Sequence, residues 1–284
     1  MNPVHPTGLL RRRSVVCGLG AALAAPLVAR AAASTPWRLA VVPQLTPLEM
    51  TRNWAPVVRA LSEAGLPCEL VVYPSISAFE PEFLRGRADI VYLNPYHMVM
   101  ARRAHGYEPL LRDRRLLEGV LVVKKEGWIQ DLVQLEAHRI SFPSPNTLAS
   151  SMYLRALLQR DYRLRYDAHY ALNHRNAVRQ VLAGDSAAAG AIRTTLELEP
   201  PHVQQALRVI YTTPGLPPHP VAVHPRVPAG LRTVLQRALT DLSRDTAGRA
   251  VMHAIQMPDP VHASYRSDYA PIEGLQLEKF LVIE

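Results

Sequence analysis

The chain has 284 residues, a formal net charge of +8 and two cysteines. Half of that charge lies in the first 33 residues, which contain four arginines and no acidic residue, so the remainder carries +4. The other basic residues are interspersed with acidic ones, which excludes nucleic acid as an expected partner. Only Cys68 lies beyond the N-terminal segment, so no intramolecular disulfide is expected there.

The N-terminal segment 1–33 has the pattern of a secretory signal. Arginines precede a short apolar run that ends in small residues, and Arg12 and Arg13 with the three residues after them fit the twin-arginine pattern. We expect export to the periplasm and cleavage after Ala31 or Ala33, with the general secretory route as the alternative to twin-arginine export.

Predicted strands and helices alternate from residue 37 onwards. Strands at 37–43, 68–73 and 88–93 are each followed by a helix, at 48–64, 78–85 and 96–105. This order is typical of a mostly parallel sheet that is covered by helices.

The alternation starts again after a strand at 119–125. The next predicted helices span 129–135, 150–159, 175–182 and 194–206, and the strands between and after them span 139–142, 166–172, 187–192 and 207–212. The proline-rich stretch 212–220 predicts a crossing, after which helices follow at 229–245 and 248–255. We therefore expect an α/β protein with two mostly parallel sheets, lobe 1 comprising 34–122 and 221–284 and lobe 2 comprising 123–220.

Ligands of open parallel sheets bind at the carboxyl ends of the strands. The loops at these ends carry hydroxyl, amide, imidazole and guanidinium groups and no carboxylate, a set that suits a small anion. The sequence therefore predicts a cleft that binds an oxyanion. The candidate ligand-binding residues are Gln44, Tyr96, His97, Ser144, Asn146, Thr147, His174, Arg193 and His219.

The turn that contains Ser144, Asn146 and Thr147 leads from a strand into a helix. The first N–H groups of a helix have no partner within the helix, and the helix dipole favours an anion there. The alternative is that Asn146 and Thr147 are ordinary N-cap residues.

Each of the other candidates also has two interpretations. His174 either donates to the ligand or caps the helix that follows it, and Arg193 either binds the anion or pairs with Glu197. Tyr96 and His97 line the pocket or hold their helix to the sheet. Gln44 belongs to the pocket or to a simple turn, and His219 contacts the ligand or serves as part of a hinge.

The sequence contains no catalytic signature. We find no nucleophile elbow, no metalloprotease motif, no phosphate-binding loop and no dinucleotide fingerprint, so we expect neither enzymatic activity nor a cofactor. His97, His174 and His219 lack zinc-like spacing, so we expect no metal site.

Four segments together resemble the phosphate/phosphite/phosphonate-binding proteins of ABC transporters: Tyr92–Ala101, Ser141–Ser150, Asn173–Arg193 and Leu216–Pro225. The resemblance covers essentially all of the chain after the signal segment. It implies a type II periplasmic-binding fold whose two α/β lobes close over a small oxyanion. It also implies a membrane permease as the partner.

The resemblance also implies positions for the family's binding residues. The serine and threonine at a helix start fall on Thr147 and Leu148, so one hydroxyl is kept and one is lost. The family histidine falls on His174. Two family tyrosines fall on Met98 and near Ile76, where this chain has no tyrosine.

The family's acidic residue in the proline-rich crossing falls on His219. A carboxylate rejects fully deprotonated anions and an imidazole does not, so we expect His219 to admit oxyanions without a proton, such as sulfate. We expect a monomeric protein that delivers its ligand to an ABC transporter. The alternative is a sensory subunit that presents an oxyanion to a membrane histidine kinase.

Overall fold

The structure is a computed structural model that describes residues 35–282. The predicted signal segment 1–33, with its arginine pair and cleavage site, therefore lies outside the described residues. None of the helices described between residues 35 and 282 is both long and apolar enough to span a bilayer.

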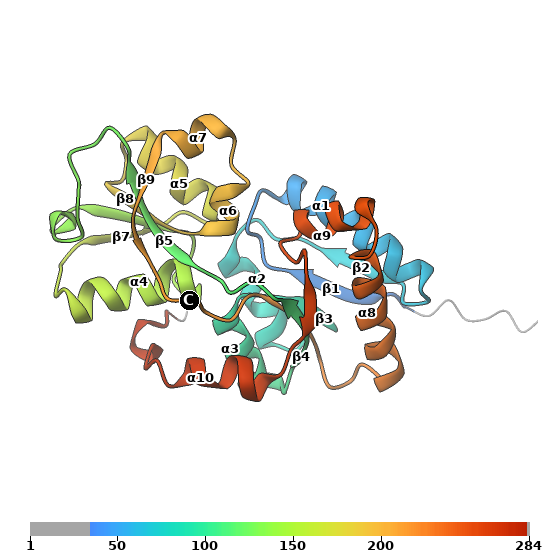
Figure 1. Cartoon of the computed structure of the whole chain (residues 1–284). Coiled ribbons are helices and arrows are strands. Elements are labelled where there is room, and N and C mark those ends of the chain that lie inside the picture. The colour runs from blue at the N-terminus through green and yellow to red at the C-terminus, as the bar shows by residue number, and fades with distance from the viewer. Residues whose placement is uncertain (1–34, 283–284) are drawn as a thin grey trace, which may run out of the picture. The chain divides into compact units, whose positions relative to one another are not determined.

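The first of two sheets has six strands in the order β11-β4-β10-β3-β1-β2 (Figure 1). Its strands are β1 (Trp37–Val41), β2 (Cys68–Val71), β3 (Ile90–Tyr92), β4 (Glu108–Asp113), β10 (Pro220–Val223) and β11 (Pro260–His262). The helices of this lobe are α1 (Pro47–Glu63), α2 (Ile76–Leu84), α3 (Pro95–His105), α8 (Ala229–Leu242), α9 (Thr246–Ala254) and α10 (Ala270–Glu273).

The second sheet has five strands in the order β7-β6-β8-β5-β9. They are β5 (Gly119–Lys124), β6 (Arg139–Phe142), β7 (Asp167–Tyr170), β8 (Ala188–Ile192) and β9 (Leu207–Thr212). The helices of this lobe are α5 (His174–Ala183), α6 (Arg193–Glu197), α7 (Pro201–Gln205) and a helix whose middle is α4 (Tyr153–Ala156), flanked by the π-helical turns Leu148–Met152 and Leu157–Asp161.

The predicted two-lobed α/β architecture is confirmed, but the prediction of mostly parallel sheets is wrong. Two of five strand pairings are parallel in the first sheet and two of four in the second, so both sheets are mixed. The strands next to the two crossings, β4, β5, β9 and β10, pair antiparallel with their neighbours. Strand β5 pairs along its length with β8, so the first crossing lies before Gly119 and the predicted boundary at 122 falls inside a strand.

Several predicted elements differ in detail. The helix expected at 194–206 is broken into α6 and α7, because Pro200 and Pro201 remove two backbone donors. The helix expected at 129–135 is only the 3₁₀ turn Val133–Leu135. Strands β4 and β11 were not predicted from the sequence.

The parallel parts of the two sheets position the polar loops. Strands β7, β6 and β8 are parallel neighbours, so the loops after their carboxyl ends meet at one edge of the second sheet. Strands β2, β1 and β3 do the same in the first sheet. The predicted gathering of strand-end loops is therefore present in both lobes.

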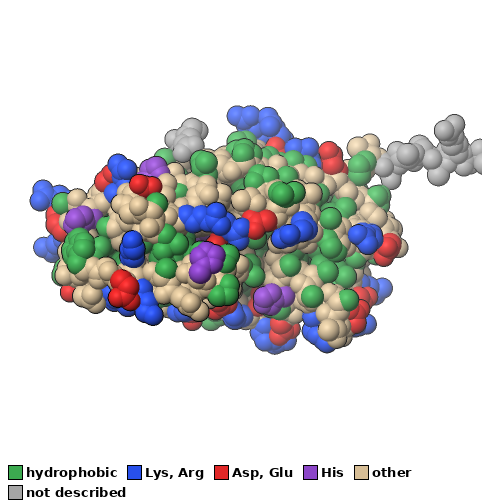
Figure 2. All heavy atoms as spheres, turned by 90° about the horizontal axis from the view of Figure 1, so that it is seen from above, with side chains coloured by type: hydrophobic (Ala, Val, Ile, Leu, Met, Phe, Trp, Pro, Cys, Tyr) green, Lys and Arg blue, Asp and Glu red, His purple; other side chains and the backbone are tan. Residues whose placement is uncertain are grey.

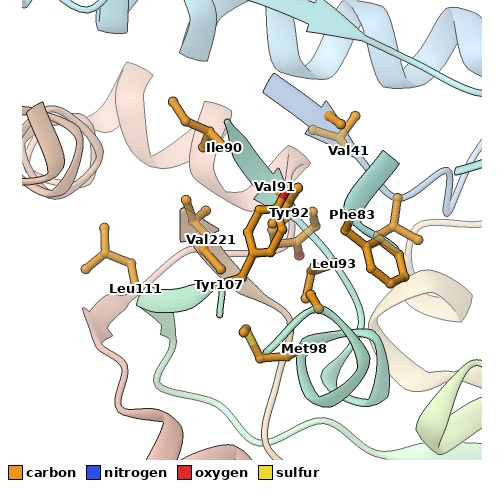
Figure 3. Close-up of a cluster of buried hydrophobic side chains, with 14 of the residues drawn as sticks. Val41, Phe83, Ile90, Val91, Tyr92, Leu93, Met98, Tyr107, Leu111 and Val221 are labelled. Atoms are coloured by element: carbon orange, nitrogen blue, oxygen red, sulfur yellow. The ribbon is translucent and has the colours of Figure 1, made fainter. Parts of the chain in front are cut away.

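A hydrophobic core lies around β1, β3 and β10, and part of it comes from the second lobe. Met98 of α3, Leu93 and Tyr107 all belong to this buried cluster (Figure 3). Leu148 and Met152 belong to the same cluster although they follow β6 of the other sheet. Met98 and Leu148 are two of the positions where the family resemblance implies a hydroxyl, and in this chain both side chains pack in the core.

Two glycines let the helix start at Leu148 lie directly against the second sheet. A Cβ atom on Gly119 of β5 would lie 2.3 Å from the carbonyl oxygen of Ala149, and one on Gly190 of β8 would lie 2.0 Å from that of Ser150. Neither distance is compatible with any side chain, so this close approach of backbone to backbone requires glycine.

We expect Gly190→Ala to destabilise the protein by about 1–3 kcal/mol, because the added methyl group overpacks the contact between β8 and the helix start. Gly230→Ala is the matched control, since a Cβ atom there meets nothing within 4 Å. Urea unfolding of both variants measures the difference, and equal stability of the two variants would contradict this account of Gly190.

Candidate functional site

The helix start after β6 retains polar groups without partners. Thr147 is the N-cap residue, and no side chain caps this start within the described part of the chain. Its hydroxyl donates to the Ser144 carbonyl oxygen at 3.2 Å and accepts from the Ser150 hydroxyl at 2.9 Å. Ser144 Oγ is buried and has no hydrogen-bond partner among residues 35–282. The loop therefore holds a buried hydroxyl that is free to bind a ligand.

His174 lies beside this loop, because α5 follows β7 and β7 is the parallel neighbour of β6. Asn173 caps α5 by accepting from the Asn176 N–H at 2.9 Å, so the alternative in which His174 is the cap is wrong. His174 is 2% exposed, and its Nδ1 has no partner among the residues described. Burial lowers the pKa of His174 to about 3, so the ring is neutral near pH 7.

His219 enters the same region from the second crossing. It is buried, and its ring stacks on Tyr92 of β3 with the centroids 5.5 Å apart. Burial, together with the neighbouring His174 and His97, lowers the pKa of His219 to about 3. Gln44, which follows β1, contacts His219 with Nε2 3.2 Å from the ring Nε2.

A buried carboxylate that the sequence analysis missed also lies between the lobes. Glu80 of α2 is 8% exposed and accepts from Asn146 Nδ2 at 3.0 and 3.2 Å. His97 Nε2 lies 3.0 Å from the same carboxylate. The strand-end loops themselves carry no carboxylate, but α2 brings one to two of their donors. The only signal in the sequence was a pair of glutamates within the otherwise apolar helix α2.

Glu80 changes the interpretation of two predicted donors. Asn146 is committed to Glu80 and to Val282, with which it exchanges hydrogen bonds of 2.8 and 3.0 Å. His97 places Nε2 3.0 Å from Glu80, and its buried Nδ1 has no partner among the described residues. We assign Asn146 a structural role, because its amide is already paired.

Two further candidates face other partners. Tyr96 is buried, and its pKa is raised first by burial and then by Glu278. Arg193 pairs with Glu118 and donates to Thr212 Oγ1 at 3.1 Å. The expected alternative pairing with Glu197 is wrong.

Other charged side chains near Arg193 are paired as well. Glu197 is paired instead with Arg115, at 2.9 Å. Figure 2 shows basic side chains interspersed with acidic ones on the face in view. The guanidinium that the sequence offered as an anion donor is therefore already neutralised by a carboxylate.

An ion bridge joins the lobes next to His174. Arg175 donates from Nε to Glu199 Oε1 at 2.6 Å and also pairs with Glu49 of α1 in the first lobe. Glu49 is held in place by the Thr46 hydroxyl, which donates to its Oε2 at 2.6 Å. This bridge and the Glu80–Asn146 hydrogen bonds both join the two lobes.

Within residues 35–282, no three His, Cys, Asp or Glu side chains are arranged to hold a metal ion. What the site does offer is a set of neutral donors in a buried setting. The Ser144 hydroxyl, the uncapped helix start and the two neutral imidazoles can each donate to an oxygen, and none of them carries a full charge.

Comparison with known proteins gives one family and several structural neighbours. The family described as "ABC transporter, phosphonate, periplasmic substrate-binding protein" matches residues 39–269. No curated protein matches the sequence.

Two solved structures share the fold closely. PhnD1 from Prochlorococcus marinus, in complex with methylphosphonate, is 14% identical with a TM-score of 0.76, over 84% of this chain and 96% of its own. A binding protein component of an ABC phosphonate transporter from Pseudomonas aeruginosa is 15% identical with a TM-score of 0.76, over 86% of each chain. A Xanthomonas citri protein bound to ATP is 17% identical with a TM-score of 0.61, over 87% of this chain and 96% of its own.

The two buried histidines make stability depend on pH. An imidazole with a pKa of about 3 when folded and about 6.5 when unfolded stays neutral in the fold but gains a proton on unfolding as the pH falls below 6.5. The stability that each histidine contributes is thus complete above pH 6.5 and decreases toward pH 3. Between pH 7 and pH 5 each accounts for a loss of about 2 kcal/mol.

We therefore expect His219→Gln to lose about 2 kcal/mol less than the wild type between pH 7 and pH 5 in chemical denaturation. His202→Gln, at an exposed position of α7, is the control and should behave like the wild type. If all three proteins lose the same stability over this range, His219 is not held neutral by burial.

Proposed function

We propose that this protein, which belongs to the family of periplasmic phosphonate-binding proteins of ABC transporters, holds a small phosphonate-like oxyanion between its two lobes. Membership of the family makes it a periplasmic binding component, not an enzyme, that works with a membrane permease. No feature of residues 35–282 or of the relatives favours the sensory alternative, so transport is the function that we propose.

The observation that carries the proposed site is that two of the buried polar atoms without partners lie at the ends of neighbouring parallel strands. Ser144 Oγ and His174 Nδ1 follow neighbouring parallel strands, and neither has a hydrogen-bond partner among the described residues. Leaving a buried polar group unpaired costs about 1–3 kcal/mol. An oxyanion that accepts from both groups would remove this cost.

The charge of the donors also bears on the ligand. His174 and His219 are neutral near pH 7, because burial lowers both pKa values to about 3. They would therefore bind an anion through N–H dipoles in a buried setting, where hydrogen bonds to a charged acceptor are strong. The backbone N–H groups at the start of the helix after Thr147 would add to them.

The solved relatives bear on the ligand class only by analogy. The Prochlorococcus protein was solved with methylphosphonate and the Xanthomonas protein with ATP, so two neighbours of this fold hold phosphorus oxyanions of different size. We take methylphosphonate, phosphite and phosphate as first candidates. Sulfate tests the expectation that His219, in place of an acidic residue, admits an anion without a proton.

We expect His174→Ala and Ser144→Ala each to weaken oxyanion binding by about 10- to 100-fold, because each removes one hydrogen bond to a charged ligand. A thermal-shift titration with methylphosphonate, phosphite, phosphate and sulfate measures the effect, since a ligand of the folded state alone raises its stability. His202→Ala is the control. If no oxyanion stabilises the wild type while amino acids do, the proposed function is wrong.

The same titration tests the role of His219. We expect sulfate to bind the wild type and His219→Asp to abolish sulfate binding while a protonated phosphonate still binds, because a carboxylate needs a hydrogen from its partner. Strong stabilisation of the wild type by phosphonates and none by sulfate would show that His219 does not set this preference.

A further inference from the structure

Four polar side chains form a hydrogen-bonded chain that ends at His219. Thr194 at the start of α6 in the second lobe donates from Oγ1 to Gln256 Oε1 at 2.7 Å. Gln256 Nε2 lies 3.2 Å from Gln44 Oε1. Gln44 Nε2 in turn lies 3.2 Å from His219 Nε2. Elements of both lobes thus connect to one imidazole.

The direction of each hydrogen bond follows from the atoms involved. An amide oxygen can only accept, so the Thr194 hydroxyl donates to Gln256 and the Gln256 amide nitrogen donates to Gln44. The Gln44 amide nitrogen can only donate, which makes His219 Nε2 the acceptor. A neutral imidazole with a bare Nε2 carries its hydrogen on Nδ1.

Burial and stacking limit the other partners that could set the tautomer of His219. Gln44 is 2% exposed and His219 is 5% exposed, so bulk water has little access to either. The stacking of His219 on Tyr92 fixes the ring plane, with 28° between the two rings. His219 and Gln256 also line one cavity between the crossings, which leaves space next to the imidazole.

Gln256 is the residue after the C-cap of α9, and backbone hydrogen bonds at this helix end fix its position. It follows the end of α9 with a φ of 62°, a left-handed conformation that residues other than glycine and asparagine seldom adopt. Its Nε2 lies 3.5 Å from Thr195 Oγ1 as well, so both threonines at the start of α6 surround the amide.

We propose that Gln44 and Gln256 are positioning residues that fix the tautomer of His219, so that its Nδ1–H is the hydrogen offered to the oxyanion. The inference deepens the proposed function and rests on it for the ligand. The tautomer itself is a property of the protein without ligand, and it can be measured independently.

The test is the ¹⁵N NMR spectrum of the imidazoles in the full-length protein without ligand. We expect a protonated Nδ1 and a bare Nε2 for His219 in the wild type. Gln44→Glu should reverse this pattern, because a carboxylate accepts from Nε2–H. A protonated Nε2 for His219 in the wild type would overturn the proposal.

The chain contains a matched control for this substitution. Gln180 Nε2 lies 3.0 Å from His169 Nε2, so the same kind of pair exists in the second lobe away from His219. Gln180→Glu should change the tautomer of His169 and leave His219 unchanged. If Gln180→Glu alters the tautomer of His219 as much as Gln44→Glu does, the effect is not local and the hydrogen-bonded chain is not its cause.

A second variant covers the case in which Gln44→Glu does not fold. Gln256→Asn keeps a residue that tolerates the left-handed conformation but shortens the side chain by one methylene. We expect His219 to populate both tautomers and methylphosphonate to bind about three- to tenfold more weakly. A single Nδ1–H tautomer with unchanged affinity in this variant would contradict the proposal.

Failure of this inference can be told apart from failure of the proposed function. If methylphosphonate binds but His219 carries its hydrogen on Nε2, the proposed role of Gln44 and Gln256 is wrong and the oxyanion function stands. If the tautomer is as expected but no oxyanion binds, the assignment of Nδ1–H to an oxyanion is wrong together with the proposed function.

Discussion

The structure depends on hydrogen bonds between polar side chains that are buried between its two mixed sheets. A buried hydroxyl, amide, imidazole or carboxylate destabilises the fold unless it finds a partner. Most of those between the lobes do: Glu80 binds Asn146, and Gln44 binds Gln256 and His219. Ser144 and His174 are among the residues that keep a buried polar atom without a partner in the described part of the chain, and both follow neighbouring parallel strands. We place the proposed binding site at those two atoms.

The same contacts explain how the lobes are held. Arg175 pairs with carboxylates of both lobes, and Glu80 reaches from the first lobe to Asn146 of the second. Apolar residues at the helix start after β6 join the core of the first lobe, and glycines in β5 and β8 let that helix start lie against the sheet. The loop that offers the free hydroxyl is thus fixed by packing from both lobes, which preorganises the site for a small ligand.

Much of this arrangement could be predicted from the sequence, because alternating apolar runs locate strands, and parallel strands bring their following loops together. Ser144, His174 and His219 follow from this reasoning as candidate binding residues. Glu80 was missed because it belongs to a helix and not to a strand-end loop. Strand β4 was missed because Pro109 and the charged residues at both of its ends are uncommon in strands. Strand β11 was missed because it has only three residues. Which donors are already paired depends on distances across the lobes, and no sequence pattern encodes those.

The central claim is that His174 donates from the cleft to an oxyanion. A ¹⁵N NMR titration of the imidazoles with methylphosphonate measures this contact directly. The account predicts that the His174 Nδ1 signal shifts and saturates with added ligand, while the ring of His202 on α7 is unaffected. Saturable binding of methylphosphonate that leaves the His174 ring unchanged would contradict the account, because the ligand would then occupy a different site.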